Sequence, residues 1–348
     1  MTGWTRHDRF NATLAGHIPD RTPVSAWRHF VDAENDAASL AEATAAFTRQ
    51  WDWDWVKLNP RATYYAEAWG SEFDAHDYDD VLPRQLRAAI ATAADLSAIG
   101  VLKPTDSPAL REQLAAARLV RAALPDVPVT ETVFSPLSVL LQLAGLPLYA
   151  GGTIYGSTPT LTFADLLRAD RSGVHHALHA IALTLAEYVA TLTAPASTTG
   201  TDGAGLDGIF YAVTGTASPA LLDESAFREL SRPYDEIVLA AAAGSHRILH
   251  TCGPTSHAEW FDDYPVDAVH WDQHAACNPD VDAPLRAVPI GGVAHSLFAT
   301  HDSAAVDEQA RAAVARTQGR PFLLAPACSV SITTDDPTLA ALRGAVEA

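Results

Sequence analysis

Short apolar runs alternate with longer Ala- and Leu-rich segments along almost the whole chain, and this alternation limits the fold more than any other feature. Most of the short runs are closed by a glycine, a proline or a polar residue, which is typical of buried strands. The longer segments repeat apolar residues with a period near 3.6, as amphipathic helices do. Because strands that alternate with helices pair in parallel and are covered by those helices, the pattern predicts an α/β protein.

The expected elements fill the chain without a long linker. Strands are expected at residues 23–27, 54–58, 98–102, 127–134, 208–213, 247–251, 268–271, 288–290 and 322–325. Helices are expected at residues 37–47, 84–96, 108–124, 174–192, 224–243 and 305–316. Roughly eight or nine strands alternating with helices predict a (β/α)8 TIM barrel, with residues 1–348 as a single domain. A doubly wound sheet is the alternative, but no G-x-G-x-x-G segment opens a helix. The small polar residues of 194–205 indicate a surface loop.

Charge and cysteine content argue against several classes of protein. The net charge is -19, from 42 acidic and 23 basic residues, so neither nucleic acid nor an anionic membrane surface is expected as a partner. No run approaches the ~18 consecutive apolar residues of a transmembrane helix. Residues 1–11 are polar and charged, unlike a secretory signal, and three cysteines are too few for a disulfide framework. We therefore expect a cytoplasmic protein.

His250, Cys252 and Cys328 each lie at the end of a short apolar run that reads as a strand. His250 and Cys252 are two residues apart, so on a strand their side chains point the same way. A catalytic zinc site takes three protein ligands, accepts imidazole and thiolate, and keeps one position open. Taken singly, each residue has a plainer interpretation, because buried Cys usually packs as a small hydrophobe and His forms hydrogen bonds. Together the three predict an open zinc site.

Other polar residues follow the expected strands, near the end of the barrel where active sites of such barrels are found. Catalytic roles are expected for Arg28, Asn59, Glu131 and Asp272, and cofactor contacts for Tyr211 and His274. Asp272 and His274 are also candidates for a fourth metal ligand. Plainer interpretations stand beside these: Arg28 as an ion-pair partner of Asp32, and the segment around Asp272 as a polar loop. The roles of nearby Cys277, His295 and His301 stay open.

The two ends of the chain resemble the uroporphyrinogen decarboxylase superfamily. Residues 9–24, RFNATLAGHIPDRTPV, are similar to its first helix and strand, and residues 323–345, which begin LLAPACS, to its last strand and helix. The resemblance covers nearly the whole length and implies a (β/α)8 barrel. Arg28 matches one family arginine, but the family's catalytic Asp, substrate-positioning Tyr, C-terminal His and second arginine correspond to Asn59, Gln142, Cys328 and Asp32. Because a porphyrinogen needs cationic partners for its carboxylates, decarboxylation of that substrate is not expected.

The segments His-x-Cys-Gly at 250–253 and Ala-Pro-x-Cys at 325–328 are similar to a zinc-dependent branch of that superfamily. The branch includes methylcobalamin:coenzyme M methyltransferases and related corrinoid methyltransferases, and cobalamin-independent methionine synthase has a similar pattern. The resemblance implies Zn²⁺ held by His250, Cys252 and Cys328, and a small-molecule thiol as methyl acceptor. It also implies a corrinoid such as methylcobalamin, or another donor, as methyl source. Coordination to zinc deprotonates a thiol and leaves it reactive.

Two other functions stay open. A zinc-dependent lyase or hydrolase would use metal-bound water, and a carboxylate beside the metal, from Glu131 or Asp272, would favour it. A non-catalytic corrinoid- or metal-binding protein would keep the barrel without the reaction. No Asp-x-His-x-x-Gly segment of the kind that holds a corrinoid is present, so a corrinoid would arrive free or on a separate corrinoid protein. The oligomeric state also stays open, a homodimer included.

Overall fold

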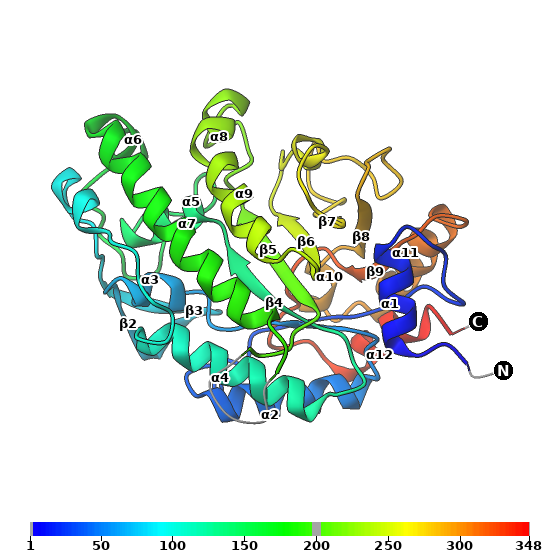
Figure 1. Cartoon of the computed structure of the whole chain (residues 1–348). Helices are drawn as coiled ribbons and strands as arrows, with labels where there is room; N and C mark the ends of the chain where they lie inside the picture. The colour runs from blue at the N-terminus through cyan, green and yellow to red at the C-terminus, as the bar shows by residue number, and fades with distance from the viewer. Residues whose placement is uncertain (1–2, 197–202, 348) are drawn as a thin grey trace.

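Seven parallel strands form one curled sheet in the computed structural model, which describes residues 3–196 and 203–347 (Figure 1). The strands pair in the order β1-β4-β5-β6-β7-β8-β9, so neighbours in the sheet follow one another along the chain. Their bounds are β1 Val56–Leu58, β4 Val129–Phe134, β5 Gly208–Thr214, β6 His246–Thr251, β7 Ala268–His270, β8 Val288–Val293 and β9 Leu323–Pro326. Within the sheet, β5 and β8 are buried on both faces, as parallel strands covered by helices are.

Residues 23–27, expected as the first strand, form a single bridge between Val24 and Leu324 of β9. The Ser25 amide donates to the Leu324 carbonyl at 3.2 Å, and the Leu324 amide donates to the Pro23 carbonyl at 2.9 Å. On the other side, the Asp54 amide donates to the Val24 carbonyl at 3.0 Å, two residues before β1 begins. The segment thus joins the two edges of the sheet, and the architecture is TIM-barrel-like.

Helices surround the sheet, and α2, α4, α7 and α9 pack side by side around its outside (Figure 1). Polar caps begin many of them: Asp36, Ser107 and Asp302 accept backbone amides of α2, α4 and α11. The α-helices are α1 Arg6–Leu14, α2 Ala37–Trp51, α3 Tyr64–Ala68, α4 Pro108–Ala123, α5 Pro136–Leu143, α6 Phe163–Ala169, α7 Arg171–Thr193, α8 Glu224–Leu230, α9 Arg232–Ala241, α10 Ser296–Ala299, α11 Ser303–Arg316 and α12 Asp336–Gly344. None of the helices in the described ranges has the length and apolarity that a membrane crossing requires.

Three expected elements differ from the structure. Residues 84–96 are not one helix: β3 (Leu82–Arg87) pairs antiparallel with β2 (Glu72–Asp79), and a 3-10 helix follows at Ala93–Ala98. Residues 98–102 are not a strand, because their polar groups bind side chains instead of a ladder: the Gly100 carbonyl accepts from Trp69 Nε1 and the Leu102 amide donates to Thr184 Oγ1. The helix expected at 224–243 is broken at Ser231, before the proline in the first turn of α9.

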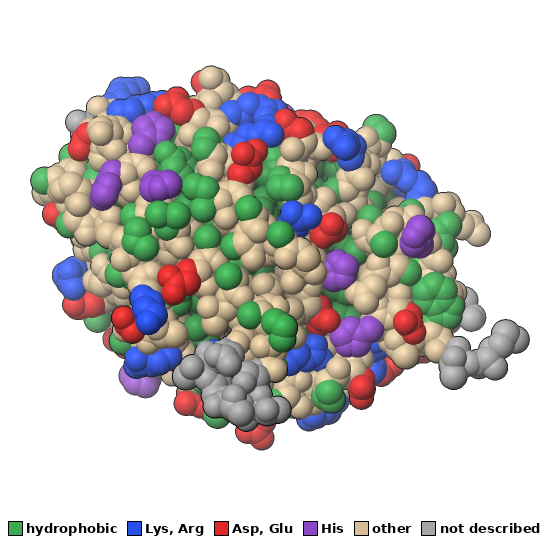
Figure 2. Space-filling model, in the orientation of Figure 1, with side chains coloured by type: hydrophobic (Ala, Val, Ile, Leu, Met, Phe, Trp, Pro, Cys, Tyr) green, Lys and Arg blue, Asp and Glu red, His purple; other side chains and the backbone are tan. Residues whose placement is uncertain are grey.

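One predicted loop lies partly beyond what the structure describes. Of the polar stretch 194–205, residues 197–202 lie outside the described part of the chain, and Ala204, which follows them, is buried. On the face shown in Figure 2, acidic side chains are interspersed with basic ones. Over that face the negative net charge is therefore spread rather than gathered into one acidic patch.

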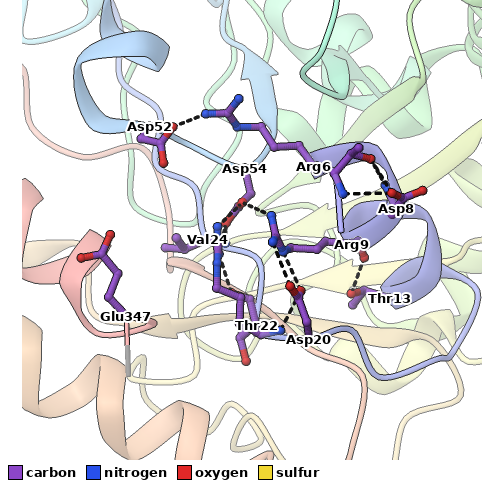
Figure 3. Close-up of polar contacts among 12 residues, drawn as sticks. Arg6, Asp8, Arg9, Thr13, Asp20, Thr22, Val24, Asp52, Asp54 and Glu347 are labelled. Carbon is purple, nitrogen blue, oxygen red and sulfur yellow. Dashed lines mark hydrogen bonds and ion pairs between the residues drawn. The ribbon is translucent and has the colours of Figure 1, made fainter. Parts of the chain in front are cut away.

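The N-terminal end of the barrel is closed by α1. Phe10 of α1 packs against Trp55 with the ring centroids 5.7 Å apart, inside a buried cluster that lines the barrel floor. Arg9 donates to both oxygens of Asp20 at 2.6 and 2.9 Å (Figure 3). Arg21 donates to both oxygens of the buried Asp54 carboxylate at 2.6 and 2.7 Å. This end is thus sealed by packing and paired charges.

Candidate metal centre

His250, Cys252 and Cys328 converge at the C-terminal ends of β6 and β9. His250 is the penultimate residue of β6, Cys252 follows that strand, and Cys328 lies two residues beyond β9. The backbone fixes these positions: the Cys252 amide donates to the Thr214 carbonyl at 2.9 Å, and the Ala327 amide to the Val293 carbonyl at 2.7 Å. One ligand atom from each of the three residues lies within 4.8 Å of the others. The structure therefore brings together the three residues that the sequence singled out.

A chain of hydrogen bonds orients the His250 ring. His270 Nε2 lies 2.8 Å from the Pro326 carbonyl, which can only accept, so this nitrogen carries the proton. Burial lowers the pKa of His270 to about 3, so its ring is neutral and its Nδ1 is an acceptor. His250 Nδ1 lies 2.7 Å from that acceptor and must donate to it. In a neutral His250 ring the lone pair is therefore on Nε2, where a metal ion would bind.

The two thiols share a hydrogen bond. Cys252 Sγ donates to Cys328 Sγ across 3.7 Å, and both cysteines are free thiols. That hydrogen bond lowers the pKa of the Cys328 thiol and raises the pKa of the Cys252 thiol, so Cys328 loses its proton first. Two sulfurs and one imidazole nitrogen that lie within 4.8 Å of one another are a donor set that zinc accepts, with room for a fourth ligand. The residues present fit a zinc ion.

A cavity of about 680 Å³ opens above this cluster, and His250 and Cys328 form part of its lining. One wall is the turn of the β2–β3 hairpin at residues 80–83, and another is the loop at residues 147–154. Apolar residues such as Phe73, Phe134, Leu148 and Ile154 line most of the space. The volume lies within the range of cavities that enclose small-molecule ligands. A ligand in this cavity would be held by an apolar wall and a few polar groups at the base.

Asn59 and Lys57 form the polar part of the wall on the β1 side. Lys57 Nζ donates to Asn59 Oδ1 at 2.5 Å, and both side chains are buried and line the cavity. Asn59 Nδ2 is buried and has no hydrogen-bond partner among the described residues. Asn59 was singled out from the sequence, whereas Lys57 was not. Lys57 is flanked by Val56 and Leu58 in an apolar run, and a lysine in a strand that is buried on both faces is the signal that could have found it.

Asp272 and His295 form an ion pair beside the thiols. Asp272 Oδ2 lies 3.5 Å from His295 Nδ1, and His295 lines the cavity. The Asp272 carboxylate raises the pKa of His295. Burial opposes ionisation of Asp272, but His295 and the His274 amide lower its pKa overall. His274 Nε2 lies 3.2 Å from the Gly292 carbonyl, and His274 is not among the residues that line the cavity.

Besides Asp272 and His274, three further predicted site residues are absent from the cavity lining. Glu131 accepts hydrogen bonds from Tyr188 and, at 3.4 Å, from Tyr64, in the layer between the sheet and the helices. Tyr211 donates to Asp235 at 2.5 Å in the same outer layer. Thr132 and Ala212, their neighbours on β4 and β5, line the cavity, so strand alternation turns Glu131 and Tyr211 outward.

The third of these residues, Arg28, lies over the rings of Phe30 and Phe47 at 5.4 and 5.1 Å and is likewise absent from the cavity lining. Two other residues with open roles also lie elsewhere. Cys277 is exposed, with φ at 65°, and His301 pairs with Asp335 at 3.6 Å on the surface. Neither is part of the cavity lining. Tyr149, which was not predicted, does line the cavity beside Cys252, and burial, with a contribution from the two thiols, raises the pKa of its hydroxyl.

His270 is a second residue that the sequence argument missed. It lies on β7 directly beside His250, and the two residues are register partners across parallel strands. The aligned ends of 246–251 and 268–270 could have indicated it, because residues at the same register on neighbouring parallel strands face the same side. A histidine at the matching position of the next strand is therefore the signal that could have indicated His270.

Comparison with known proteins gives one family and two similar structures. The family model described as uroporphyrinogen decarboxylase (URO-D) matches residues 5–348. The chain is similar to a methyltransferase from Methanosarcina mazei, with 18% identity, a TM-score of 0.77 and 98% of each chain covered. It is also similar to a B12-independent methionine synthase from Shewanella sp. W3-18-1 in complex with selenomethionine, with 12% identity, a TM-score of 0.50, and 93% and 92% of the two chains covered. At these identities the two structures establish the fold alone. No curated protein matches the sequence.

Proposed function

This chain belongs to the uroporphyrinogen decarboxylase family. Within that family, we propose that it is a zinc-dependent methyltransferase acting on a small thiol. The observation that carries the proposal is the convergence of His250, Cys252 and Cys328 within 4.8 Å at the base of a cavity. The methyl donor is a corrinoid, free or on a separate corrinoid protein, or another methyl compound. Zinc would acidify the acceptor thiol and keep the resulting thiolate reactive.

The protein's own groups account for binding and orientation. The hydrogen bond from His250 to His270 keeps Nε2 of His250 free for the metal. Two cysteine ligands place negative charge at the site, which weakens activation of water and favours soft sulfur as the further ligand. A substrate that fills the cavity would displace water from between the apolar walls, which would leave a thiolate there poorly solvated and more nucleophilic.

Porphyrinogen decarboxylation does not suit this cavity. Where the family resemblance puts the catalytic Asp, Asn59 accepts a hydrogen bond from Lys57. A neutral amide beside an ammonium offers no counter-charge to pyrrole N–H groups. Arg61, which lines the cavity, is already bound to Glu67 and Glu112 at 2.8 and 2.5 Å, so it does not offer a free clamp for substrate carboxylates.

A zinc-dependent lyase or hydrolase is the second candidate. The Asp272–His295 pair favours it, because a carboxylate and an imidazole beside a metal could accept a proton from water. Glu131, the other carboxylate considered for this role, faces the helix layer and not the cavity. Only one of the two carboxylates therefore supports this function.

Three finer points belong to the proposal. We take the barrel to be of the (β/α)8 type, with residues 23–27 in place of the eighth strand, which their hydrogen bonds to both sheet edges support. We also take the chain to work as one domain in the cytoplasm. A homodimer would be compatible with a site formed within one chain. None of these points is needed for the metal assignment.

Elemental analysis and X-ray absorption test the proposal. The purified protein should hold about one zinc per chain, and Cys328→Ser should lose most of it while keeping its far-UV circular dichroism. Cys277→Ser is the matched control, because Cys277 is the exposed cysteine. Addition of the true acceptor from a panel of small thiols should add a sulfur neighbour at about 2.3 Å from zinc. Full zinc content in Cys328→Ser would contradict the metal assignment. Hydrolysis of a substrate with no thiol in the zinc shell would favour the second candidate.

A further inference from the structure

Among the residues that the structure describes, the cavity lining includes one lysine and one arginine, and the two differ in their partners. Arg61 donates to Glu67 and Glu112 and also to the Glu34 carbonyl at 3.1 Å, so its charge is balanced inside the protein. Lys57 has one hydrogen-bond partner, the neutral amide oxygen of Asn59. Within the described ranges no carboxylate lies within ion-pair distance of Lys57. When it is protonated, Lys57 is therefore a buried cation that no carboxylate of the described residues balances.

The surroundings of Lys57 make this imbalance costly. The side chain is 7% exposed, and Nζ lies 5.3 Å from the Trp27 ring centroid and 4.9 Å from that of Phe210. An ammonium has three donors, and the Asn59 oxygen takes one of them. Burial lowers the pKa of Lys57 to about 7, although the nearby thiols favour its charged form. Because a buried cation without an anion is unfavourable, the cavity is arranged for a negative charge that arrives from outside.

Lys57 and the proposed metal ligands share the base of the cavity. The Phe210 ring that the ammonium approaches is 5.5 Å from the His250 ring and 5.4 Å from the His270 ring. One aromatic ring thus separates the cation from His250, so a small molecule bound to the metal also lies close to Lys57. Two thiolates and a neutral imidazole cancel the charge of a divalent zinc ion. An acceptor thiolate would add one negative charge, and one ammonium would balance it.

We propose that Lys57 is the anion-binding residue of this cavity and receives the negative charge that the methyl acceptor brings, with Asn59 as the positioning residue that orients the ammonium. This inference rests on the proposed function. The negative charge has two sources that share the same chemistry: the sulfur itself as thiolate, or a carboxylate elsewhere on the same small thiol. A thiol that binds as thiolate gives its S–H proton to the buffer, so no further reactant is needed.

The chain offers a built-in control, because Lys57 and Lys103 are its only lysines and Lys103 is exposed. Zinc-loaded protein with isotope-labelled lysine therefore gives two side-chain signals in NMR. We use three probes: ethanethiol, 3-mercaptopropionate and propionate. Lys57→Met removes the charge at similar length, Lys57→Arg keeps the charge, and Lys103→Met is the matched control. Dissociation constants for each variant come from calorimetry, together with zinc content.

If the negative charge is the thiolate, Lys57→Met should raise the dissociation constant of ethanethiol about tenfold, as expected for loss of one charge-assisted hydrogen bond. If the negative charge is a carboxylate, the same variant should weaken the binding of 3-mercaptopropionate and propionate but not the binding of ethanethiol. In both cases Lys57→Arg restores binding in part, Lys103→Met binds like the parent, and the Lys57 signal shifts while the Lys103 signal does not. Equal affinities in parent and Lys57→Met, or no shift of the Lys57 signal with any probe, would overturn the proposal. If the protein holds no zinc but propionate still binds through Lys57, the methyltransferase proposal fails and the assignment of Lys57 stands.

Discussion

The two ends of the barrel differ in how their buried charges are paired. At the N-terminal end, Asp54 is fully buried and its carboxylate accepts from the Val24 amide (Figure 3). Arg21 also donates to this carboxylate. At the C-terminal end, Lys57 and Asn59 keep unused donors in the described structure, and two thiols lie 3.7 Å apart. Buried polar groups normally have hydrogen-bond partners, so the unused donors of Lys57 and Asn59 indicate that a ligand binds at the C-terminal end. The N-terminal end, where the buried charges are paired, contributes stability, in keeping with the usual division in such barrels.

Removal of the Asp54 carboxylate should have the largest effect on stability. Asp54→Ala leaves Arg21 without its main partner and the Val24 amide without an acceptor, so unfolding should become easier by about 3–5 kcal/mol. Urea unfolding followed by circular dichroism measures the change. Zinc content per folded chain should equal that of the parent. A loss of less than about 1 kcal/mol would remove the contrast between the two ends.

His270→Phe should act on the other end, with a large effect on metal affinity and a smaller one on stability. Without its partner the His250 ring is no longer held with Nε2 toward the metal, so zinc affinity should fall by about 10–100-fold. His270→Gln is the informative companion, because a Gln oxygen can accept from His250 and its amide can donate to the Pro326 carbonyl. Competition with a fluorescent chelator measures both affinities. If the Gln and Phe variants lose zinc equally, the orienting role of the ring is excluded.

Glu131→Gln tests a buried acid that is on the barrel wall and at neither end. Burial raises the pKa of Glu131 to about 8, so the folded state keeps a proton that the unfolded state has lost between about pH 4.5 and pH 8. Stability of the parent should therefore fall as pH rises through that window, and the Gln variant should lack this slope. We expect the variant to be more stable than the parent at pH 8 by roughly 1–3 kcal/mol, and nearly equal at pH 4.5. Urea unfolding midpoints of parent and variant at both pH values measure this difference. An equal dependence of stability on pH in the two proteins would show that Glu131 does not keep its proton in the folded state.

Asp52→Asn should have the smallest effect, although Asp52 belongs to the same N-terminal network as Asp54. Asp52 pairs with Arg6 and, at 2.8 Å, with Arg343, but its side chain is 60% exposed. Exposed ion pairs contribute little, so the loss should stay below about 1 kcal/mol. The Asn side chain also tolerates the left-handed backbone at φ 54°. A loss as large as that of Asp54→Ala would show that burial does not explain the strength of the closed end.

The sequence predicted the convergence of His250, Cys252 and Cys328 better than the positions of the other candidate site residues. His250, Cys252 and Cys328 follow strands, and a strand end is recognisable from its breaker. Glu131 and Tyr211 could not be assigned to a side, because strands buried on both faces show no alternation of apolar and polar residues. The β2–β3 hairpin was missed because residues 84–96 carry a helical period, while pairing with β2 decides their structure. Lys57 was not identified because both of its neighbours in the chain are apolar.

The hydrogen bond from His270 to the Pro326 carbonyl runs from β7 to the last residue of β9, past β8. The backbone bonds at Cys252 and Ala327 likewise hold the thiol-bearing segments to their neighbours. These contacts belong to the polypeptide alone and do not depend on a metal ion. In a zinc finger the chain is unfolded until the metal arrives. Under the proposed function we expect the reverse order: a newly synthesised chain would fold first and take up zinc afterwards, so a shortage of zinc would leave intact, inactive molecules that recover when the supply returns.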